Sequence, residues 1–328
     1  MVNGKAPIKV LSVVGAGRSG TTLLASILSE VEGFVSAGEL RWLWQRGVLE
    51  QRPCGCGKPP SDCPVWAPVI AATLQPARDG TPTVTVDEII AAQQEVGAAR
   101  NRLRVLRSTT ADVPGWNALT TVRQAVATAC NALARETGSS VVIDTSKRPH
   151  DAAVVARLPE VQHYIVHLVR DPRAVVHSWR QAKAYSVAGK DKTMAARRLP
   201  STVRRWWASG LGTEVLLRQL PEASYLRMRY EDFCLDPRGA VGEIISLLDE
   251  TGSAPFEDKN TVLLHPNHIV AGNPSRFTVG SVEIRTDDRW RAEMPRRDQR
   301  LVGVSTEPLL RRYGYRIRPL AGSSRSRP

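Results

Sequence analysis

A glycine-rich turn with a helix behind it is the first candidate for chemistry in this chain. The turn reads GAGRSG over residues 15–20, and Thr21 and Thr22 begin the helical pattern that follows it. Glycine has no Cβ, so the backbone N–H groups of such a turn can converge on one point, and the helix adds the positive end of its dipole. We therefore predict that this loop binds a phosphate.

Two common phosphate-binding motifs fit the loop in part. Gly15, Gly17 and Gly20 satisfy the dinucleotide fingerprint GxGxxG, and Glu39 lies near the position of a ribose-binding acid, which favours an NAD(P)-dependent oxidoreductase. The outer glycines also have the spacing of a Walker A loop, but Thr21 stands where that loop carries lysine. Chemistry at a γ-phosphate is therefore not expected.

Polar residues also follow three other apolar runs that have the composition of buried strands. These runs are residues 34–37 before Glu39, residues 141–143 before Asp144 and Lys147, and residues 164–169 before Arg170. In an α/β sheet, ligand-binding groups gather at the carboxyl ends of the strands. We expect these side chains to meet at one edge of a sheet.

Each of these residues also has a plainer interpretation. Glu39 fits an acidic residue at the N-terminus of a helix over residues 40–46. Lys147 fits a solvated loop residue, and Arg170 fits a strand-end arginine that pairs with a nearby acid. Ser178, eight residues beyond Arg170, fits a hydroxyl on a helix surface. Residue type alone does not decide between these interpretations.

Two stretches resemble the donor-binding motifs of sulfotransferases that use 3′-phosphoadenosine 5′-phosphosulfate (PAPS). Residues 18–22, RSGTT, are similar to the 5′-phosphosulfate loop of the bacterial and tyrosylprotein sulfotransferases. Residues 163–179, HYIVHLVRDPRAVVHSW, resemble the 3′-phosphate motif of the same family. A dinucleotide-binding enzyme is not expected to carry a second phosphate-binding strand end. An enzyme that binds PAPS needs one, because PAPS has two separated phosphates. We therefore favour the sulfotransferase interpretation.

The resemblance implies how the donor would be held. The loop residues that would bind the 5′-phosphosulfate are Gly17, Arg18, Ser19, Gly20, Thr21 and Thr22. Arg170 and Ser178 would bind the 3′-phosphate, and Tyr230, in a YED sequence, would lie near the adenine. The RKGxxG signature of the cytosolic enzymes is absent, so Arg276 is the candidate for the last contacts to the 3′-phosphate.

The resemblance also implies a reaction, in-line displacement at sulfur that releases 3′,5′-ADP. Arg18 and Lys147 would neutralise charge on the sulfonate and the leaving oxygen. Glu39 is the first candidate for the general base, and Asp144 is the second. The acceptor would offer a hydroxyl, with an amine as the less favoured alternative, and belong to a small molecule, a glycan or a lipid. This mechanism requires no metal.

The elements that position these residues are expected to form one P-loop-like α/β domain over residues 1–320, with a central parallel sheet flanked by helices. Apolar residues at helical spacing over 86–108 and 117–137 predict a helical insertion. Together with a Cys-rich loop, this insertion occupies about residues 40–138. Its expected role is to cover the sheet and shape the acceptor pocket.

The C-terminal half carries fewer signals of chemistry. We predict a strand over residues 224–229, a final amphipathic helix over 298–313 and a disordered Ser/Arg tail over 321–328. Residues 185–199 resemble the mobile segment over the active site of sulfotransferases. Trp206 and its neighbour fit either core residues or an acceptor-binding wall.

Three cysteines, Cys54, Cys56 and Cys63, lie in a Pro/Gly-rich loop that reads CGCGKPPSDCPVW. Thiolates ligate metals, but the CxxC pairs of common zinc sites are missing and the sequence shows no fourth ligand nearby, so a metal site is not favoured. A disulfide, a packing role and a lid over the substrate stay open. Similar inserts occur in bacterial proteins of the sulfotransferase class.

The composition indicates anionic partners. The chain has 328 residues and 45 Lys and Arg against 32 Asp and Glu, a formal charge of +13. Its arginines are spread out and no nucleic-acid-binding module is recognisable, so nucleic acid is not expected as a partner. The N-terminal apolar run is interrupted by Arg18 and is too short to span a membrane, although peripheral contact with an anionic membrane stays open.

The cysteine count indicates the compartment. The chain has five cysteines, an odd number, and we do not expect a secretory leader. This favours a reducing environment and hence a cytoplasmic enzyme. The sequence does not predict an oligomeric state.

Overall fold

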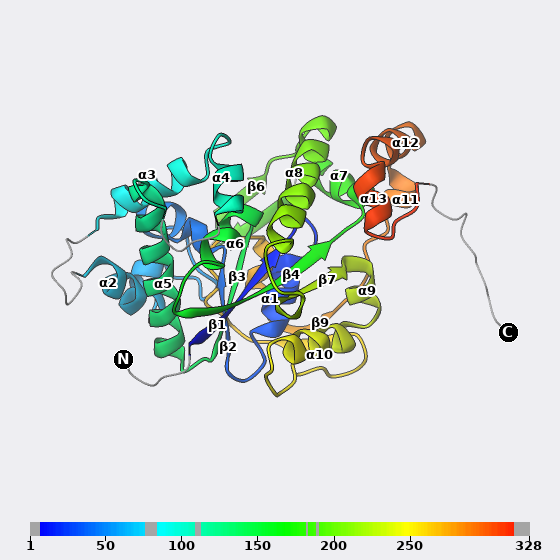
Figure 1. Ribbon diagram of the computed structural model, residues 1–328. Helices are drawn as coiled ribbons and strands as arrows, with labels where there is room; N and C mark the ends of the chain where they lie inside the picture. Colours follow the sequence, from blue (N-terminus) through cyan, green and yellow to red (C-terminus); the bar gives the residue numbers. More distant parts are fainter. Residues whose placement is uncertain (1–6, 76–83, 109–112, 182, 188–189, 318–328) are drawn as a thin grey trace.

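Five parallel strands form the central sheet of the computed structural model, which describes residues 7–75, 84–108, 113–181, 183–187 and 190–317 (Figure 1). The strands in spatial order are β2 (Phe34–Gly38), β3 (Val141–Lys147), β1 (Ile8–Val14), β4 (Val161–Val169) and β7 (Tyr225–Arg229). The central strands are apolar runs buried on both faces, as parallel sheets require. The predicted α/β fold with a central parallel sheet is confirmed.

The strand order differs from that of a dinucleotide-binding sheet. β2 lies at one edge, and β3 separates it from β1. In the Rossmann order, the second strand in the chain lies directly beside the first. The topology therefore gives no support to the oxidoreductase interpretation of the glycine loop.

Alternate residues of β1 face two separate cores, as the period of a strand requires. Leu11 and Val13 pack with α1 (Thr21–Leu28) and α10 (Pro237–Leu247) on one face. Val10 and Val14 pack on the opposite face. The helices of that face are α2 (Trp66–Leu74), α3 (Val86–Val96), α5 (Asn117–Thr137), α6 (Pro149–Val155) and α8 (Leu199–Leu217). In Figure 1, α10 lies below the sheet and α8 above it.

The two segments predicted to be helical, residues 86–108 and 117–137, are helical with one interruption. α5 has the predicted bounds, whereas residues 86–108 divide into α3 and α4 (Arg102–Arg107). The break begins at Gly97, the C-cap of α3, because glycine is a poor helix former. Three short helical turns lie at the start of the insertion: η1 (Leu40–Trp42), η2 (Leu43–Leu49) and η3 (Pro60–Asp62).

The region predicted to form one final helix, residues 298–313, contains two helices, α12 (Arg296–Ser305) and α13 (Glu307–Arg312). The prediction of one continuous helix was therefore wrong. Pro308 lies in the first turn of α13, where its missing N–H costs nothing, but inside one long helix it would break the ladder. The tail over 321–328 lies outside the described residues.

The remaining elements connect the sheet to the C-terminal helices. They are α7 (Pro172–Arg180), β5 (Lys183–Val187), β6 (Lys190–Met194), η4 (Glu222–Ser224), α9 (Tyr230–Leu235), β8 (Thr261–Leu264), η5 (Pro274–Phe277), β9 (Gly280–Glu283) and α11 (Trp290–Glu293). β5 and β6 form an antiparallel hairpin within the segment expected to be mobile, and β8 and β9 form another.

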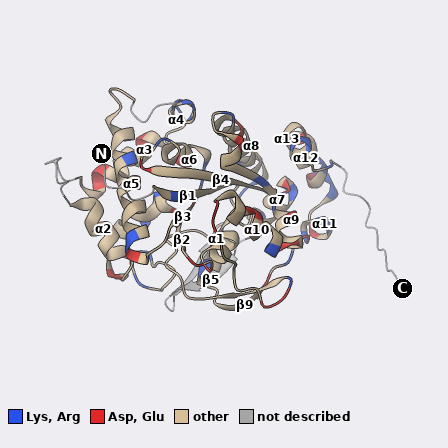
Figure 2. Ribbon diagram, turned by 60° about the horizontal axis from the view of Figure 1, so that its bottom comes forward, with Lys and Arg blue, Asp and Glu red and all other residues tan. Residues whose placement is uncertain are grey.

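Basic and acidic residues alternate along the same helices and loops (Figure 2). Many of them are paired, including Arg180 with Asp298 and Arg227 with Glu214. Within the part of the chain that the structure describes, no helix combines the length and the apolar character needed to cross a bilayer.

Candidate active site

A cleft of about 1460 Å³ opens at the carboxyl edge of the sheet. Loops that follow β1, β2, β3 and β4 contribute to its walls, as expected for an α/β sheet. The predicted site residues that line it are Gly17, Arg18, Gly20, Thr21, Thr22, Glu39, Lys147, Arg170, Ser178, Tyr230 and Arg276. Ser19 and Asp144 do not line the cleft, and both are almost fully buried.

The loop between β1 and α1 has a shape that side chains would prevent. A Cβ on Gly15 would lie 2.3 Å from the Leu168 carbonyl oxygen, and one on Gly17 would lie 3.0 Å from the Trp179 ring. Gly20, with φ of 87°, is the N-cap of α1 and offers no side chain to cap it. The first N–H groups of α1 therefore have no capping side chain, and the start of this helix lines the cleft.

Three arginines gather beside this loop. The guanidinium carbons of Arg18 and Arg197 lie 4.9 and 4.2 Å from the centre of the Trp179 ring. Burial, followed by the charges of Arg170 and Arg197, lowers the pKa of Arg18. A multiply charged anion between these groups would relieve the repulsion. Arg18 also has φ of 76°, a strained conformation for a residue with a Cβ, of the kind that is concentrated at functional sites.

Arg170 connects the two predicted phosphate-binding motifs. Its Nη1 donates to the Arg18 carbonyl oxygen at 2.9 Å, and its guanidinium lies over the Tyr230 ring at 4.3 Å. Its Nη2 donates to the Asp287 carbonyl oxygen at 3.0 Å and lies 3.5 Å from the Asp287 carboxylate. The sequence analysis did not single out Asp287, which lies 117 residues from Arg170 in the chain.

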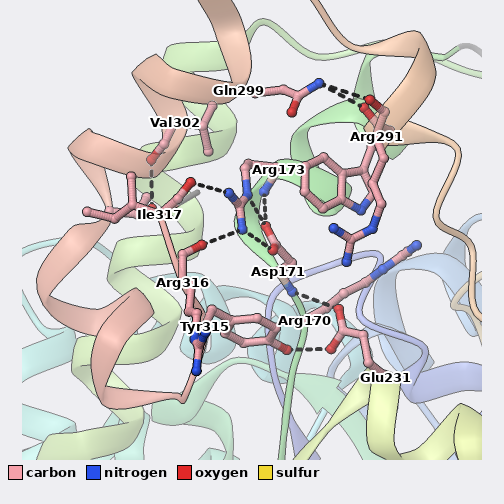
Figure 3. Close-up of polar contacts among 12 residues, drawn as sticks. Arg170, Asp171, Arg173, Glu231, Arg291, Gln299, Val302, Tyr315, Arg316 and Ile317 are labelled. Atoms are coloured by element: carbon pink, nitrogen blue, oxygen red, sulfur yellow. Dashed lines mark hydrogen bonds and ion pairs between the residues drawn. The ribbon is translucent and has the colours of Figure 1, made fainter. Parts of the chain in front are cut away.

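The other charges of the RDPR sequence serve the fold (Figure 3). Arg173 forms a buried ion pair with Asp171 at 2.6 Å and donates to the carbonyl oxygens of Arg316 and Ile317. Glu231 accepts from the Asp171 N–H at 3.3 Å. Asp171 and Arg173 thus hold the C-terminal segment against the start of α7. Of the charged residues in this sequence, Arg170 is the one that lines the cleft.

Glu39 and Lys147 meet in the cleft, because their side chains form an ion pair between Oε1 and Nζ. Lys147 has φ of 70°, the second strained residue of the site. Glu39 precedes η1, but its side chain makes no capping hydrogen bond there. A Cβ on Gly272 would lie 3.6 Å from both Glu39 Oε1 and the Thr22 hydroxyl, so Glu39 also lies beside the start of α1.

Asp144 is placed differently from Glu39. Its Oδ1 accepts hydrogen bonds from the N–H of Leu40 at 3.3 Å and from the N–H and hydroxyl of Ser146 at 2.9 and 2.6 Å. Burial raises the pKa of Asp144 to about 6. Because Asp144 joins the ends of β2 and β3 outside the cleft, its geometry favours a positioning role over direct contact with an acceptor.

Two more candidates have structural partners. Arg276 lines the cleft and donates to the carbonyl oxygens of Gly272 and Pro53, at the side of the cleft near Glu39. Trp206 is buried in the core, and its indole N–H donates to the Arg170 carbonyl oxygen at 3.1 Å. Trp206 therefore supports the strand end that presents Arg170.

Comparisons with known proteins agree with this geometry. The model of the sulfotransferase family matches residues 11–253. The chain is similar to the sulfotransferase domain from the Synechococcus PCC 7002 olefin synthase, with a TM-score of 0.52, 18% identity, and coverage of 96% of this chain and 97% of that one. For the sulfotransferase domain from the curacin biosynthetic pathway, the values are 0.50, 15%, 95% and 99%.

At these identities, the two structures show a shared fold. None of the curated proteins compared with the chain matches it significantly. The family match covers well over half of the chain and includes both the glycine loop and the strand end that carries Arg170. On these grounds, the chain belongs to the sulfotransferase family.

Proposed function

We propose that this enzyme transfers the sulfonate of PAPS to an acceptor hydroxyl and releases 3′,5′-ADP. One observation supports the proposal: the glycine loop and the Arg170 strand end line the same cleft and are joined by the hydrogen bond from Arg170 to the Arg18 carbonyl oxygen. A donor with two separate phosphates would match this pair of motifs. An amine acceptor is the less favoured alternative.

The residues of the cleft fit the donor. The N–H groups at the start of α1, with the Thr21 and Thr22 hydroxyls, would hold the 5′-phosphosulfate. Arg170 and Ser178 would hold the 3′-phosphate, since the planar guanidinium makes several hydrogen bonds to such a group. The Tyr230 ring, which touches the Arg170 guanidinium, would lie near the adenine of the donor.

The proposed chemistry uses three charged side chains. The bound donor supplies an electrophilic sulfonate, and the bond from its sulfur to the bridging oxygen breaks as the bond to the acceptor oxygen forms. Glu39 takes the proton of the acceptor hydroxyl. Lys147, in contact with Glu39, and Arg18, in the loop, neutralise charge on the bridging and equatorial oxygens.

Acceptor specificity would come from the helices that surround the cleft. Arg102, Leu103 and Leu106 of α4 and Leu211 of α8 line its wall. Their mixture of apolar and basic side chains suits a small molecule, a glycan or a lipid that carries both apolar and anionic or hydroxyl groups. We further propose a cytoplasmic enzyme that uses no nucleic-acid partner.

Thermal shifts with a ligand panel test the donor assignment. The panel contains PAPS, 3′,5′-ADP, NAD(H), NADP(H) and a DNA duplex, because only a ligand that binds the folded state raises its melting temperature. We expect stabilisation by PAPS and 3′,5′-ADP alone. Selective stabilisation by a nicotinamide cofactor or by the duplex would contradict the proposal.

Arg170→Ala is expected to weaken binding of 3′,5′-ADP about 10- to 100-fold, since it removes charge-assisted hydrogen bonds to the 3′-phosphate. Binding of 5′-AMP, which lacks that phosphate, should change little. Isothermal titration with both nucleotides makes the comparison. Arg180→Ala, at the end of α7 and paired with Asp298, is the matched control. Equal losses for both nucleotides would exclude the assignment.

Asp287→Asn is expected to tighten 3′,5′-ADP binding about 3- to 10-fold, because the Asp287 carboxylate, which pairs most closely with Arg289, also lies 3.5 Å from Arg170 and would repel a 3′-phosphate there. The gain should shrink as salt is added. Asp288→Asn, at the adjacent acid that pairs with Arg291, is the control. Unchanged or weaker binding in Asp287→Asn would show that the carboxylate does not oppose the phosphate.

A further inference from the structure

The three thiols of the Pro/Gly-rich loop meet an imidazole from a distant part of the chain. Ligand atoms of Cys54, Cys56, Cys63 and His268 all lie within 4.8 Å of one another. The sulfurs of Cys54 and Cys56 are 2.9 Å apart, and the Cys63 sulfur is 3.1 Å from Nδ1 of His268. His268 is 205 residues from Cys63 in the sequence, but the fold brings the two side chains into contact. The expectation that no fourth ligand lies nearby was therefore wrong.

We propose that these four side chains bind one structural zinc ion as a Cys₃His site. Three thiolates and one imidazole nitrogen are a ligand set that Zn²⁺ uses in tetrahedral sites. With Zn–S bonds of about 2.3 Å, sulfurs on such an ion are about 3.8 Å apart, within the span of the cluster. Binding forms three Zn–S bonds and one Zn–N bond, and the thiols release their protons without any change of oxidation state.

The surroundings hold both halves of the site in place. Cys54 and Cys63 are fully buried. The Trp66 indole N–H donates to the His268 carbonyl oxygen at 2.6 Å, and the Gly55 N–H donates to the Ile269 carbonyl oxygen at 3.0 Å. A Cβ on Gly55 would lie 1.9 Å from Oδ1 of Asn267, so glycine is required where the two segments touch.

A zinc ion accounts for the cluster better than a disulfide does. A disulfide would use two of the three thiols and leave the third beside another ligand, whereas a tetrahedral ion uses all four groups. All four positions come from the protein, so the ion would have no open position for water or substrate. The structure therefore assigns it a structural role, separate from the transfer reaction.

The site would fasten the Cys-rich loop to the sheet edge that carries Glu39. Val270, two residues beyond His268, forms a bridge with Gly38, and its carbonyl oxygen accepts from the Glu39 N–H at 2.8 Å. None of the four proposed ligand residues lines the cleft. Its loss should loosen this edge, which makes stability and metal content the direct readouts.

Metal analysis of the purified full-length chain tests the proposal. We expect about one zinc ion per chain by elemental mass spectrometry, as for a closed site. Cys63→Ser and His268→Ala should lose most of the metal, and His268→Cys should retain it because thiolate replaces imidazole as a ligand. Cys130→Ser and Cys234→Ser, at buried cysteines outside the cluster, should keep the full zinc content.

A second measurement uses the wild-type chain, so it tests the proposal even where the variants fail to fold. The wild-type chain is stripped with a chelator and titrated with Co²⁺, and the intense absorption of tetrahedral cobalt–thiolate complexes should saturate at about one equivalent. Stripping should also lower the melting temperature, and Zn²⁺ should restore it. Absence of zinc and of this absorption, equal zinc in the wild type and Cys63→Ser, or an intact mass two hydrogens lower from a disulfide would overturn the proposal.

Discussion

Glu39→Gln is expected to lower turnover by a factor on the order of 10² to 10⁴, the range for loss of a general base. Glutamine keeps the shape of the side chain and can still accept a hydrogen bond from Lys147, the partner of Glu39 in the cleft. Affinity for 3′,5′-ADP and the melting temperature should therefore stay nearly unchanged. Steady-state rates with an identified acceptor, beside nucleotide titration, make the measurement.

The matched control is Glu30→Gln. Glu30 is another partly buried carboxylate, but it pairs with His265 outside the cleft, so turnover should be retained. A helix-end role for Glu39 predicts a different result, a stability loss of about 0.3 to 1 kcal/mol with activity kept. If Glu39→Gln turns over at the wild-type rate, Glu39 is not the general base.

The pH profile gives an independent check on the base. A general base is active only when ionised, so the wild-type rate should fall on the acidic side as its carboxylate becomes protonated. In Glu39→Gln this acidic limb should disappear. An acidic limb that persists in the variant would assign the titration to another group.

Arg18→Ala is expected to lower turnover by a factor on the order of 10² to 10³ at saturating donor, as for removal of a donor aimed at developing charge. Arg18 lies in the loop that faces the cleft, and the charges of Arg170 and Arg197 surround it. In the proposed reaction its guanidinium would lie where charge develops on the sulfonate during transfer. Rates at saturating PAPS separate this effect from weaker binding.

Two variants distinguish chemistry from packing at this position. Arg18→Lys keeps the charge but loses the planar fork, so an intermediate loss of turnover is expected. Arg197→Ala removes the other guanidinium that lies over the Trp179 ring, and its effect should be smaller and mainly on donor affinity. Near-normal turnover in Arg18→Ala would restrict Arg18 to donor binding.

Local signals in the sequence were sufficient for the sheet, the glycine loop and most helices. β-branched runs predict buried strands because both faces of a parallel strand are apolar, and α5 has the bounds that helical spacing predicted. The loop could be recognised because its turn needs a backbone conformation that glycine adopts readily, as the φ of 87° at Gly20 shows. Each of these features depends on residues that are neighbours in the chain.

The pairing of side chains was decided by the tertiary structure. Glu39 meets Lys147 across 108 residues, Arg170 meets Asp287 across 117, and Cys63 meets His268 across 205. No periodicity or spacing links such residues, because their contact follows from strand order and from the return of the C-terminal segment to β2. The sequence therefore indicated which residues could do chemistry, and only the packing of the sheet decided which of them stand together.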